Sequence, residues 1–284
     1  MDKIKIITDS TADLPKKVLQ EYDIESIPLL INFGSESYLD GVEITIDEMF
    51  EKIESQNMLP TTAQITPTRF LTKLEEYTNA GYKVLLILMS SNMSGTYQSA
   101  CIARDMMENG KSEDVFVIDS QKVCSALGLL AIRASMLRKE GKTIEEIVEE
   151  IENIKNKVVS SLSFDSLDNL VRGGRISKTV GIVTGVLGIK LILDIKDGLM
   201  VVKDKVRGSK KAVKKIISDL EEQGHDPEIP VLLANIDMDE IANQLRDYLV
   251  KNNIKFIEGE IGCTVGIHSG KKATGLFFVK GNEK

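Results

Sequence analysis

The fold is inferred from the stretch Val84-Leu85-Leu86-Ile87-Leu88-Met89-Ser90-Ser91-Asn92-Met93-Ser94-Gly95-Thr96-Tyr97. Its apolar first part predicts a buried strand, and residues 100–107 beyond it predict a helix. The hydroxyls and the glycine between them therefore occupy a strand-to-helix turn. In open α/β sheets, ligands bind at the carboxyl ends of strands, and the free N–H groups at the start of a helix favour an anion. The turn is thus predicted to hold a small acid group.

The pattern of strand followed by helix recurs through the first half of the chain. Capping boxes at Thr45/Glu48 and Thr143/Glu146 mark the starts of two of its helices. The pattern changes near residues 155–162, after which a hairpin over 191–203 and further mixed elements follow. We therefore predict an α/β protein of two domains. Residues 1–158 form a three-layer α/β/α domain with a mostly parallel sheet, and residues 159–284 form a mixed-sheet α/β domain.

Composition and charge exclude several classes of protein. The 284 residues are 42% apolar and carry a formal charge of -7, which argues against a nucleic-acid binder. Cys101, Cys124 and Cys263 lie far apart, so buried thiols in a reducing compartment are favoured over disulfides or a metal site. No signal peptide and no apolar run of about 18 residues is found, so we expect a cytoplasmic protein without stable membrane insertion. Nucleotide-binding and metal-binding motifs are absent from the sequence, and no cofactor is expected.

Candidate binding residues lie in hydroxyl-rich turns and in a glycine-flanked segment. Ser10, Thr62, Ser94 and Thr96 each occupy a position where a helix cap is the simpler explanation, but several such turns at one sheet edge favour a shared polar pocket. His268 lies within residues 262–270, which are expected to form a loop. Its imidazole is suited to hydrogen-bond a carboxylate, although a plain surface histidine is equally compatible with the sequence.

Three further segments have two interpretations each. Arg172 and Arg175 flank a Gly-Gly turn that suits a carboxylate or phosphate, or an interdomain ion pair. The basic stretch 203–215 is either a solvated helix face or a docking surface for an acidic partner. In the apolar segment 180–189, glycines one helical turn apart allow close packing against a helix or a slender apolar ligand.

Four motifs together resemble the DegV family of bacterial fatty-acid-binding proteins. They are Ile7-Thr8-Asp9-Ser10-Thr11-Ala12-Asp13-Leu14, Ser90 to Ser99, Ile118-Asp119-Ser120, and Ser166 to Ser177 with its Arg172-Gly173-Gly174-Arg175 turn. The resemblance runs nearly from end to end. It implies two α/β domains with a long-chain fatty acid buried in an apolar tunnel, and a protein that is not itself an enzyme.

The resemblance also implies roles for particular residues. The fatty-acid carboxylate would be held by Thr62, Ser94 and His268, with the Gly95 N–H as a helper. The bound acid would be presented to a separate ATP-dependent fatty acid kinase, which forms an acyl phosphate. Arg207, and more loosely Arg172, resemble basic positions near the mouth of the pocket that serve this step.

Two other functions remain open from the residues. One is a serine hydrolase with Ser94 as nucleophile, His268 as base and Asp9 as orienting acid, although no nucleophile-elbow motif positions Ser94. The other is a sensor of a small metabolite with an interaction surface on the basic helix.

Overall fold

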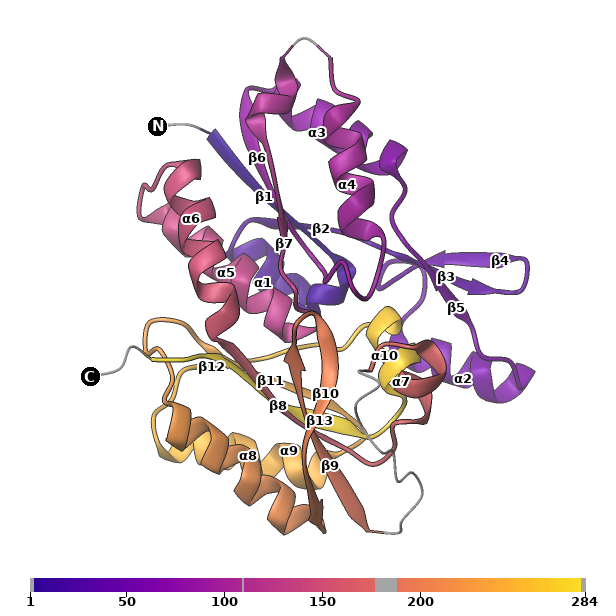
Figure 1. The fold of residues 1–284 in the computed structure, drawn as a ribbon. Helices are drawn as coiled ribbons and strands as arrows, with labels where there is room; N and C mark the ends of the chain where they lie inside the picture. Colours follow the sequence, from indigo (N-terminus) through magenta and orange to yellow (C-terminus); the bar gives the residue numbers. More distant parts are fainter. Residues whose placement is uncertain (1–2, 109, 177–187, 282–284) are drawn as a thin grey trace.

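The computed structural model describes residues 3–108, 110–176 and 188–281. In these residues, two sheets lie one above the other in the view of Figure 1, and a third, small sheet projects to one side. No helix in the described part of the chain combines the length and the apolar character needed to cross a bilayer. Most of the apolar segment 180–189, for which close helix packing was considered, lies outside the described residues.

The N-terminal sheet is parallel throughout, with strand order β2-β1-β6-β7. Its inner strand β6 pairs Leu86 with Ile7 on one side and with Val117 on the other. Residues 84–88 are completely buried, which explains why this run shows no polar alternation. The strands are β1 (Lys3–Asp9), β2 (Ile24–Ile27), β6 (Tyr82–Leu88) and β7 (Val115–Asp119).

Helices cover both faces of this sheet (Figure 1). α3 and α4 pack on one face, and α5 and α6 pack on the other. The two predicted capping boxes are confirmed, since Thr45 and Thr143 each exchange hydrogen bonds with the glutamate three residues later. The helices are α1 (Lys16–Glu21), α2 (Ile46–Gln56), α3 (Pro67–Asn79), α4 (Thr96–Asp105), α5 (Ser125–Lys139) and α6 (Ile144–Ile154).

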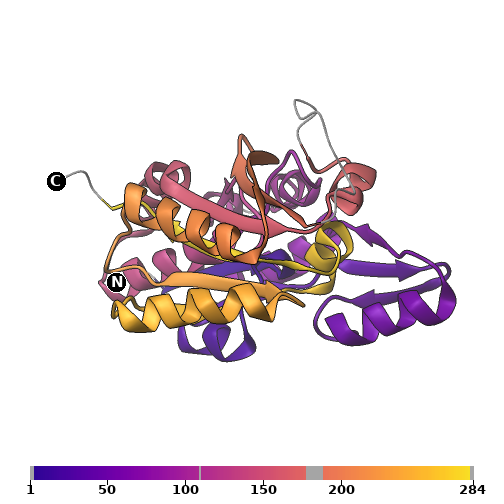
Figure 2. The same ribbon diagram turned by 90° about the horizontal axis from the view of Figure 1, so that it is seen from below.

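The second sheet is mixed, in the order β10-β9-β8-β13-β11-β12, and its β11–β12 pair is parallel while the other pairs are antiparallel. α8 and α9 cover its outer face (Figure 2). The predicted fold class, a parallel sheet followed by a mixed sheet, is confirmed. The elements are β8 (Val158–Phe164), α7 (Asp168–Gly173), β9 (Ile189–Lys196), β10 (Leu199–Arg207), α8 (Ser209–Gln223), β11 (Val231–Ile236), α9 (Asp239–Lys251), β12 (Phe256–Glu258), α10 (Cys263–Ser269) and β13 (Ala273–Val279).

Helix α5 joins the two sheets into one body. It contacts β1, β2 and β6 of the first sheet and β8, β11 and β13 of the second. Nearly every side chain from Ser125 to Leu137 is buried, so the helix has no polar face. One hydrophobic cluster runs through it from one sheet to the other. The two halves therefore share a core, and β8 of the second sheet begins at Val158.

The small sheet, with strand order β4-β3-β5, differs from the sequence expectation in two places. The apolar run 27–33 predicts a single strand, but β2 ends at Ile27 and β3 begins at Leu30, and these two strands belong to different sheets. The hydroxyl-rich stretch 60–65 predicts a loop, but it contains β5, which pairs with β3. The strands are β3 (Leu30–Phe33), β4 (Glu36–Leu39) and β5 (Thr61–Ala63).

The third difference concerns residues 262–270, which form helix α10 and not a loop. The flanking glycines are outside the helix: Gly262 is its N-cap, and Gly270 ends it with a positive φ of 71°. Glycine at the end of a helix is a stop signal, and here it encloses a helix of only seven residues. His268 therefore lies in the last turn of a helix.

Candidate functional site

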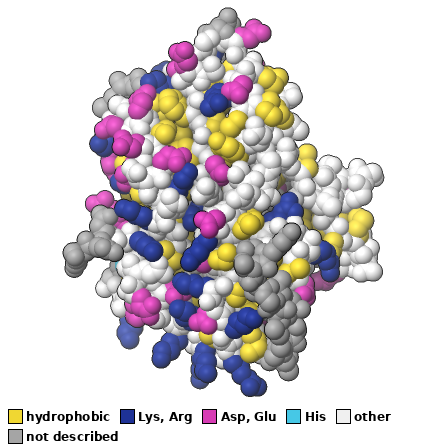
Figure 3. All heavy atoms as spheres, in the orientation of Figure 1, with side chains coloured by type: hydrophobic (Ala, Val, Ile, Leu, Met, Phe, Trp, Pro, Cys, Tyr) yellow, Lys and Arg dark blue, Asp and Glu magenta, His cyan; other side chains and the backbone are white. Residues whose placement is uncertain are grey.

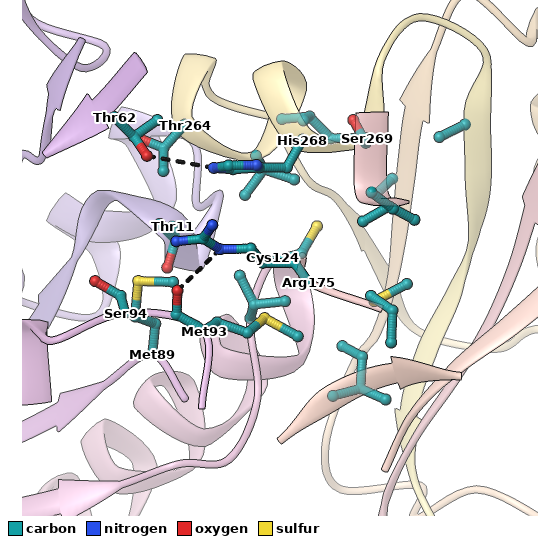
Figure 4. A pocket seen from close by; sticks show the side chains of 18 of the residues that line it. Thr11, Thr62, Met89, Met93, Ser94, Cys124, Arg175, Thr264, His268 and Ser269 are labelled. Atoms are coloured by element: carbon teal, nitrogen blue, oxygen red, sulfur yellow. Dashed lines mark hydrogen bonds between the residues drawn. The ribbon is translucent and has the colours of Figure 1, made fainter. Parts of the chain in front are cut away.

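A cavity of about 180 Å³ lies between the two halves of the chain. Its walls come from the carboxyl ends of β1 and β6, the start of α5, the inner face of the second sheet, and α10. Most of the lining is apolar, for example Leu29, Met89, Phe164 and Phe277. Polar side chains gather at one end, where Thr62, Ser94 and His268 converge with Arg175 (Figure 4). The cavity thus combines a polar end with an apolar body.

Ser94 and Gly95 occupy the turn between β6 and α4. Gly95 is the N-cap of α4, so its N–H lies outside the helical hydrogen-bond pattern. The Ser94 hydroxyl lies 3.0 Å from the Thr96 hydroxyl and accepts a hydrogen bond from the Thr96 N–H at 3.3 Å. The hydroxyl keeps further bonding capacity, and Ser94 lines the cavity.

The second half of the chain holds this turn from outside. Ser90 donates to the Gly198 carbonyl at 2.7 Å, and Asn92 donates to the Asp197 carbonyl at 2.8 Å. Both acceptors lie in the turn of the β9–β10 hairpin. Gly198 has a φ of 73°, and a Cβ atom there would lie 2.4 Å from the Ser90 hydroxyl, so this close approach requires glycine.

Thr62 and His268, which are 206 positions apart in the chain, meet at the polar end. His268 Nε2 lies 3.3 Å from Thr62 Oγ1. Burial, together with the charge of Arg175, lowers the pKa of His268 to about 4. The imidazole is therefore neutral at pH 7, with one nitrogen able to donate and the other able to accept. Its Nδ1 side faces the α carbon of Gly173, which leaves no room for a side chain at that position.

Arg175 contributes the positive charge at this end of the cavity. It donates from Nε to the Met93 carbonyl at 3.1 Å and from Nη1 to the Gly173 carbonyl. Figure 4 shows its guanidinium between His268 and the Ser94 turn. Arg175 follows Gly174, the C-cap of α7, which has a φ of 69°.

The two other arginines named from the sequence lie elsewhere. Arg172 is exposed on α7, and Arg207 is exposed at the end of β10. Neither lines the cavity. Lysines near Arg207 form a basic surface over β10 and α8, visible along the lower edge of Figure 3. This basic surface comprises the exposed residues Lys205, Arg207, Lys210, Lys211 and Lys214.

A hydrolytic triad is not assembled. Asp9 is completely buried and accepts hydrogen bonds from the N–H groups of Met89 and Thr11. Burial raises the pKa of Asp9, and its hydrogen bonds within the described residues do not include His268. The described hydrogen bonds of the Ser94 hydroxyl are both to Thr96. The geometry does not favour a serine hydrolase.

Two aspartates that sequence reasoning did not select hold the helix that carries His268. Asp13 accepts from the Gly262 N–H at 2.8 Å, and Asp40 accepts from the Cys263 N–H at 2.9 Å. Both carboxylates are buried, and burial raises the pKa of Asp13 well above its usual value. They cap α10 from the other half of the chain. Asp13 belongs to the quoted motif 7–14, which was the available signal.

Metal and thiol chemistry find no support in the described residues. No group of three or more His, Cys, Asp or Glu side chains there is arranged to hold a metal ion. The three cysteines are free, and Cys124 lines the cavity. Burial raises the pKa of the Cys124 thiol well above its usual value, which keeps it protonated and a poor nucleophile.

Comparison with known proteins places these features in a family. A family model described as the DegV family of uncharacterised proteins matches residues 3–281. A DegV domain-containing protein of Clostridium acetobutylicum is 50% identical over 280 residues, covering 99% of each chain. The crystal structure of DegV from Bacillus subtilis, described as a fatty acid binding protein, is 31% identical with a TM-score of 0.85, covering 99% of this chain and 100% of that one. A DegV family protein from Thermus thermophilus, described for its fatty acid binding, is 27% identical with a TM-score of 0.88, covering 98% and 99% of the two chains.

Proposed function

The chain belongs to the DegV family, and from that premise we propose that it binds a long-chain fatty acid in the cavity between its two halves. The carboxylate is held by Thr62, Ser94 and His268, with His268 acting through Thr62, and the acyl chain follows the apolar walls. One observation carries the proposal: the same cavity joins a polar end to an apolar body. The relatives described as fatty-acid-binding proteins have the same fold over their whole length.

The apolar lining of the cavity suits an acyl chain. Burial of each methylene contributes about 0.8 kcal/mol, so about 14 of them contribute on the order of 11 kcal/mol before ordering costs. A micromolar affinity requires only about 8 kcal/mol. The acyl chain therefore supplies most of the affinity.

The polar end supplies orientation and compensates the carboxylate for lost water. When His268 Nε2 carries the proton and donates to Thr62 Oγ1, the Thr62 hydroxyl is free to donate to the carboxylate. The Ser94 hydroxyl and the Gly95 N–H approach from the β6–α4 turn. Because the imidazole is neutral, the countercharge comes from Arg175.

The protein acts as a carrier, and the reaction takes place on another protein. It presents the bound acid to a separate ATP-dependent fatty acid kinase that forms an acyl phosphate. Arg207 and Arg172 support this division because both are exposed and stand outside the cavity. The basic surface around Arg207 offers a docking site for an acidic partner.

Mass spectrometry under native and denaturing conditions tests the proposal. We expect the native mass to exceed the denatured mass by that of one fatty acid. Ser94→Ala and His268→Ala should each weaken binding of radiolabelled palmitic acid. Ser91→Ala is the matched control, because the Ser91 hydroxyl bonds to Asp119 and does not line the cavity.

Two results would contradict this reading. Unchanged affinity in both the Ser94 and the His268 variants would refute the head-group assignment. Stoichiometric labelling of Ser94 by a fluorophosphonate, together with ester hydrolysis, would favour the hydrolase.

A further inference from the structure

We infer that Thr264 supplies an additional hydrogen bond to the carboxylate of the bound acid. This inference rests on the proposed binding of a fatty acid. Thr264 lies on α10, lines the cavity and is only 3% exposed. Its hydroxyl has no hydrogen-bond partner among the described residues. A buried hydroxyl without a partner is unfavourable, so its partner is expected in the liganded state.

The backbone of α10 does not satisfy this hydroxyl. A threonine inside a helix usually bonds to the carbonyl four residues earlier. Thr264 lies in the first turn, so the residue four positions earlier, Glu260, precedes the helix. The N–H of Thr264 is already used, since it donates to Asp40 at 3.3 Å. The backbone therefore leaves the hydroxyl of this cavity-lining residue without a partner among the described residues.

Other hydroxyls that line the cavity differ from Thr264 in this respect. The Thr11 hydroxyl donates to Asp9, and the Thr274 hydroxyl donates to the Ala234 carbonyl at 2.8 Å. The Ser269 hydroxyl donates to the Gly270 carbonyl at 3.0 Å. These three hydroxyls make structural hydrogen bonds, whereas that of Thr264 remains available to a ligand.

The position of Thr264 identifies the part of the ligand that it meets. It lies four residues before His268, so the two side chains share one face of α10. Figure 4 shows Thr264 at the Thr62 end of the cavity. An unsubstituted fatty acid has no polar atoms besides its carboxylate, so that group is the only partner it offers to the hydroxyl.

The carboxylate has capacity for this contact. Its two oxygens offer about four acceptor positions. Thr62 and Ser94 fill two of them, and the Gly95 N–H fills a third. Thr264 fills the fourth position from the α10 wall, on the side away from the β6–α4 turn.

Thr264→Val tests the inference, because valine keeps the shape of the side chain and removes only the hydroxyl. Thr8→Val is the matched control: the Thr8 hydroxyl is also buried and without a partner among the described residues, but Thr8 does not line the cavity. Affinities are measured for palmitic acid and for its uncharged methyl ester. We expect Thr264→Val to weaken binding of the acid about tenfold or more, with a smaller loss for the ester, whose carbonyl oxygen is an uncharged and weaker acceptor. Thr264→Ser should retain the affinity, and Thr8→Val should bind the acid as the unmodified protein does.

The outcomes separate this inference from the proposed function. If the unmodified protein binds neither palmitic acid nor its ester, the proposed function fails. If it binds the acid and Thr264→Val binds equally well, the inference about Thr264 is wrong and the head-group assignment stands. An equal loss for acid and ester in Thr264→Val would also refute the contact, since it would indicate a change in cavity shape.

Discussion

Gly173→Ala should displace the imidazole of His268 without a substitution in any residue that lines the cavity. A Cβ atom at this position would lie 2.6 Å from Nδ1, whereas ordinary contact begins near 3.4 Å, so the ring must retreat by about 0.8 Å. The Nε2 atom already lies 3.3 Å from Thr62 Oγ1, so the ring has no room to move straight toward that hydroxyl. It must swing aside, so the hydrogen bond from Nε2 to Thr62 Oγ1 is lost, and with it the orientation of the Thr62 hydroxyl toward the carboxylate.

The expected loss follows from the strength of the hydrogen bond that the Thr62 hydroxyl donates to the carboxylate. A bond to a charged group contributes about 1.5–3 kcal/mol, so the affinity for palmitic acid should fall roughly 10- to 100-fold. The fold itself should tolerate the change. Gly173 is the last residue of α7 and its φ is not positive, and alanine favours a helix by about 1 kcal/mol over glycine. Titration calorimetry with palmitic acid measures the affinity, and thermal unfolding of the ligand-free protein measures the stability.

Gly174→Ala provides the control at the neighbouring position. No atom lies within 4 Å of a Cβ there, but the φ of 69° makes alanine strained by about 1–2 kcal/mol. We therefore expect lower stability and unchanged affinity, the opposite of the Gly173 result. The reasoning is refuted if Gly173→Ala binds as tightly as the unmodified protein, or if Gly174→Ala loses as much affinity.

Three further predictions concern pH, the hairpin turn and the second sheet. The pKa of His268 is about 6.5 in the unfolded chain and about 4 in the folded protein, so the unfolded state binds more protons between these two pH values. The free energy of unfolding should therefore decrease by up to about 3 kcal/mol as pH falls through this window. His268→Asn should flatten that part of the pH profile measured by chemical denaturation. Gly198→Ala places a Cβ 2.4 Å from the Ser90 hydroxyl, so it should weaken palmitic acid binding by displacing the β6–α4 turn, and a normal calorimetric affinity would contradict that mechanism. Gly275→Ala brings a Cβ to 2.2 Å from the Ser161 carbonyl oxygen in β8, and only backbone movement can relieve this contact. The free energy of unfolding measured in urea should therefore fall by about 3 kcal/mol or more. An unchanged urea midpoint would count against the close β8–β13 pairing.

Local patterns predicted the parts of the fold that local interactions determine. The buried run of β6 and the helix after Gly95 fix the Ser94 turn, and both are visible in the sequence. β8 was not predicted as a strand because all its residues are buried on both faces, so its serines and apolar residues show no alternation. The helix 263–269 was read as a loop because glycines lie on both sides of it, although they only begin and end it.

Which residues form the site depends on the direction of the chain at its turns and on contacts between residues that are far apart in the sequence. The turn 172–175 offers two arginines, and the sequence does not indicate that Arg175 lines the cavity while Arg172 faces solvent. The contact between Thr62 and His268 joins residues from a strand and a helix that pack together through the tertiary fold. No periodicity in the sequence encodes such a meeting.

The two halves of the chain position the binding residues of each other. Asp13 and Asp40 of the first half cap the helix that carries His268 and Thr264 of the second. In return, the β9–β10 hairpin and Arg175 of the second half hold the turn that carries Ser94. The distance between the two walls of the carboxylate site is therefore set by the interface and not by either half alone. It follows that substitutions at these interface contacts should alter fatty-acid affinity even though the side chains never touch the ligand.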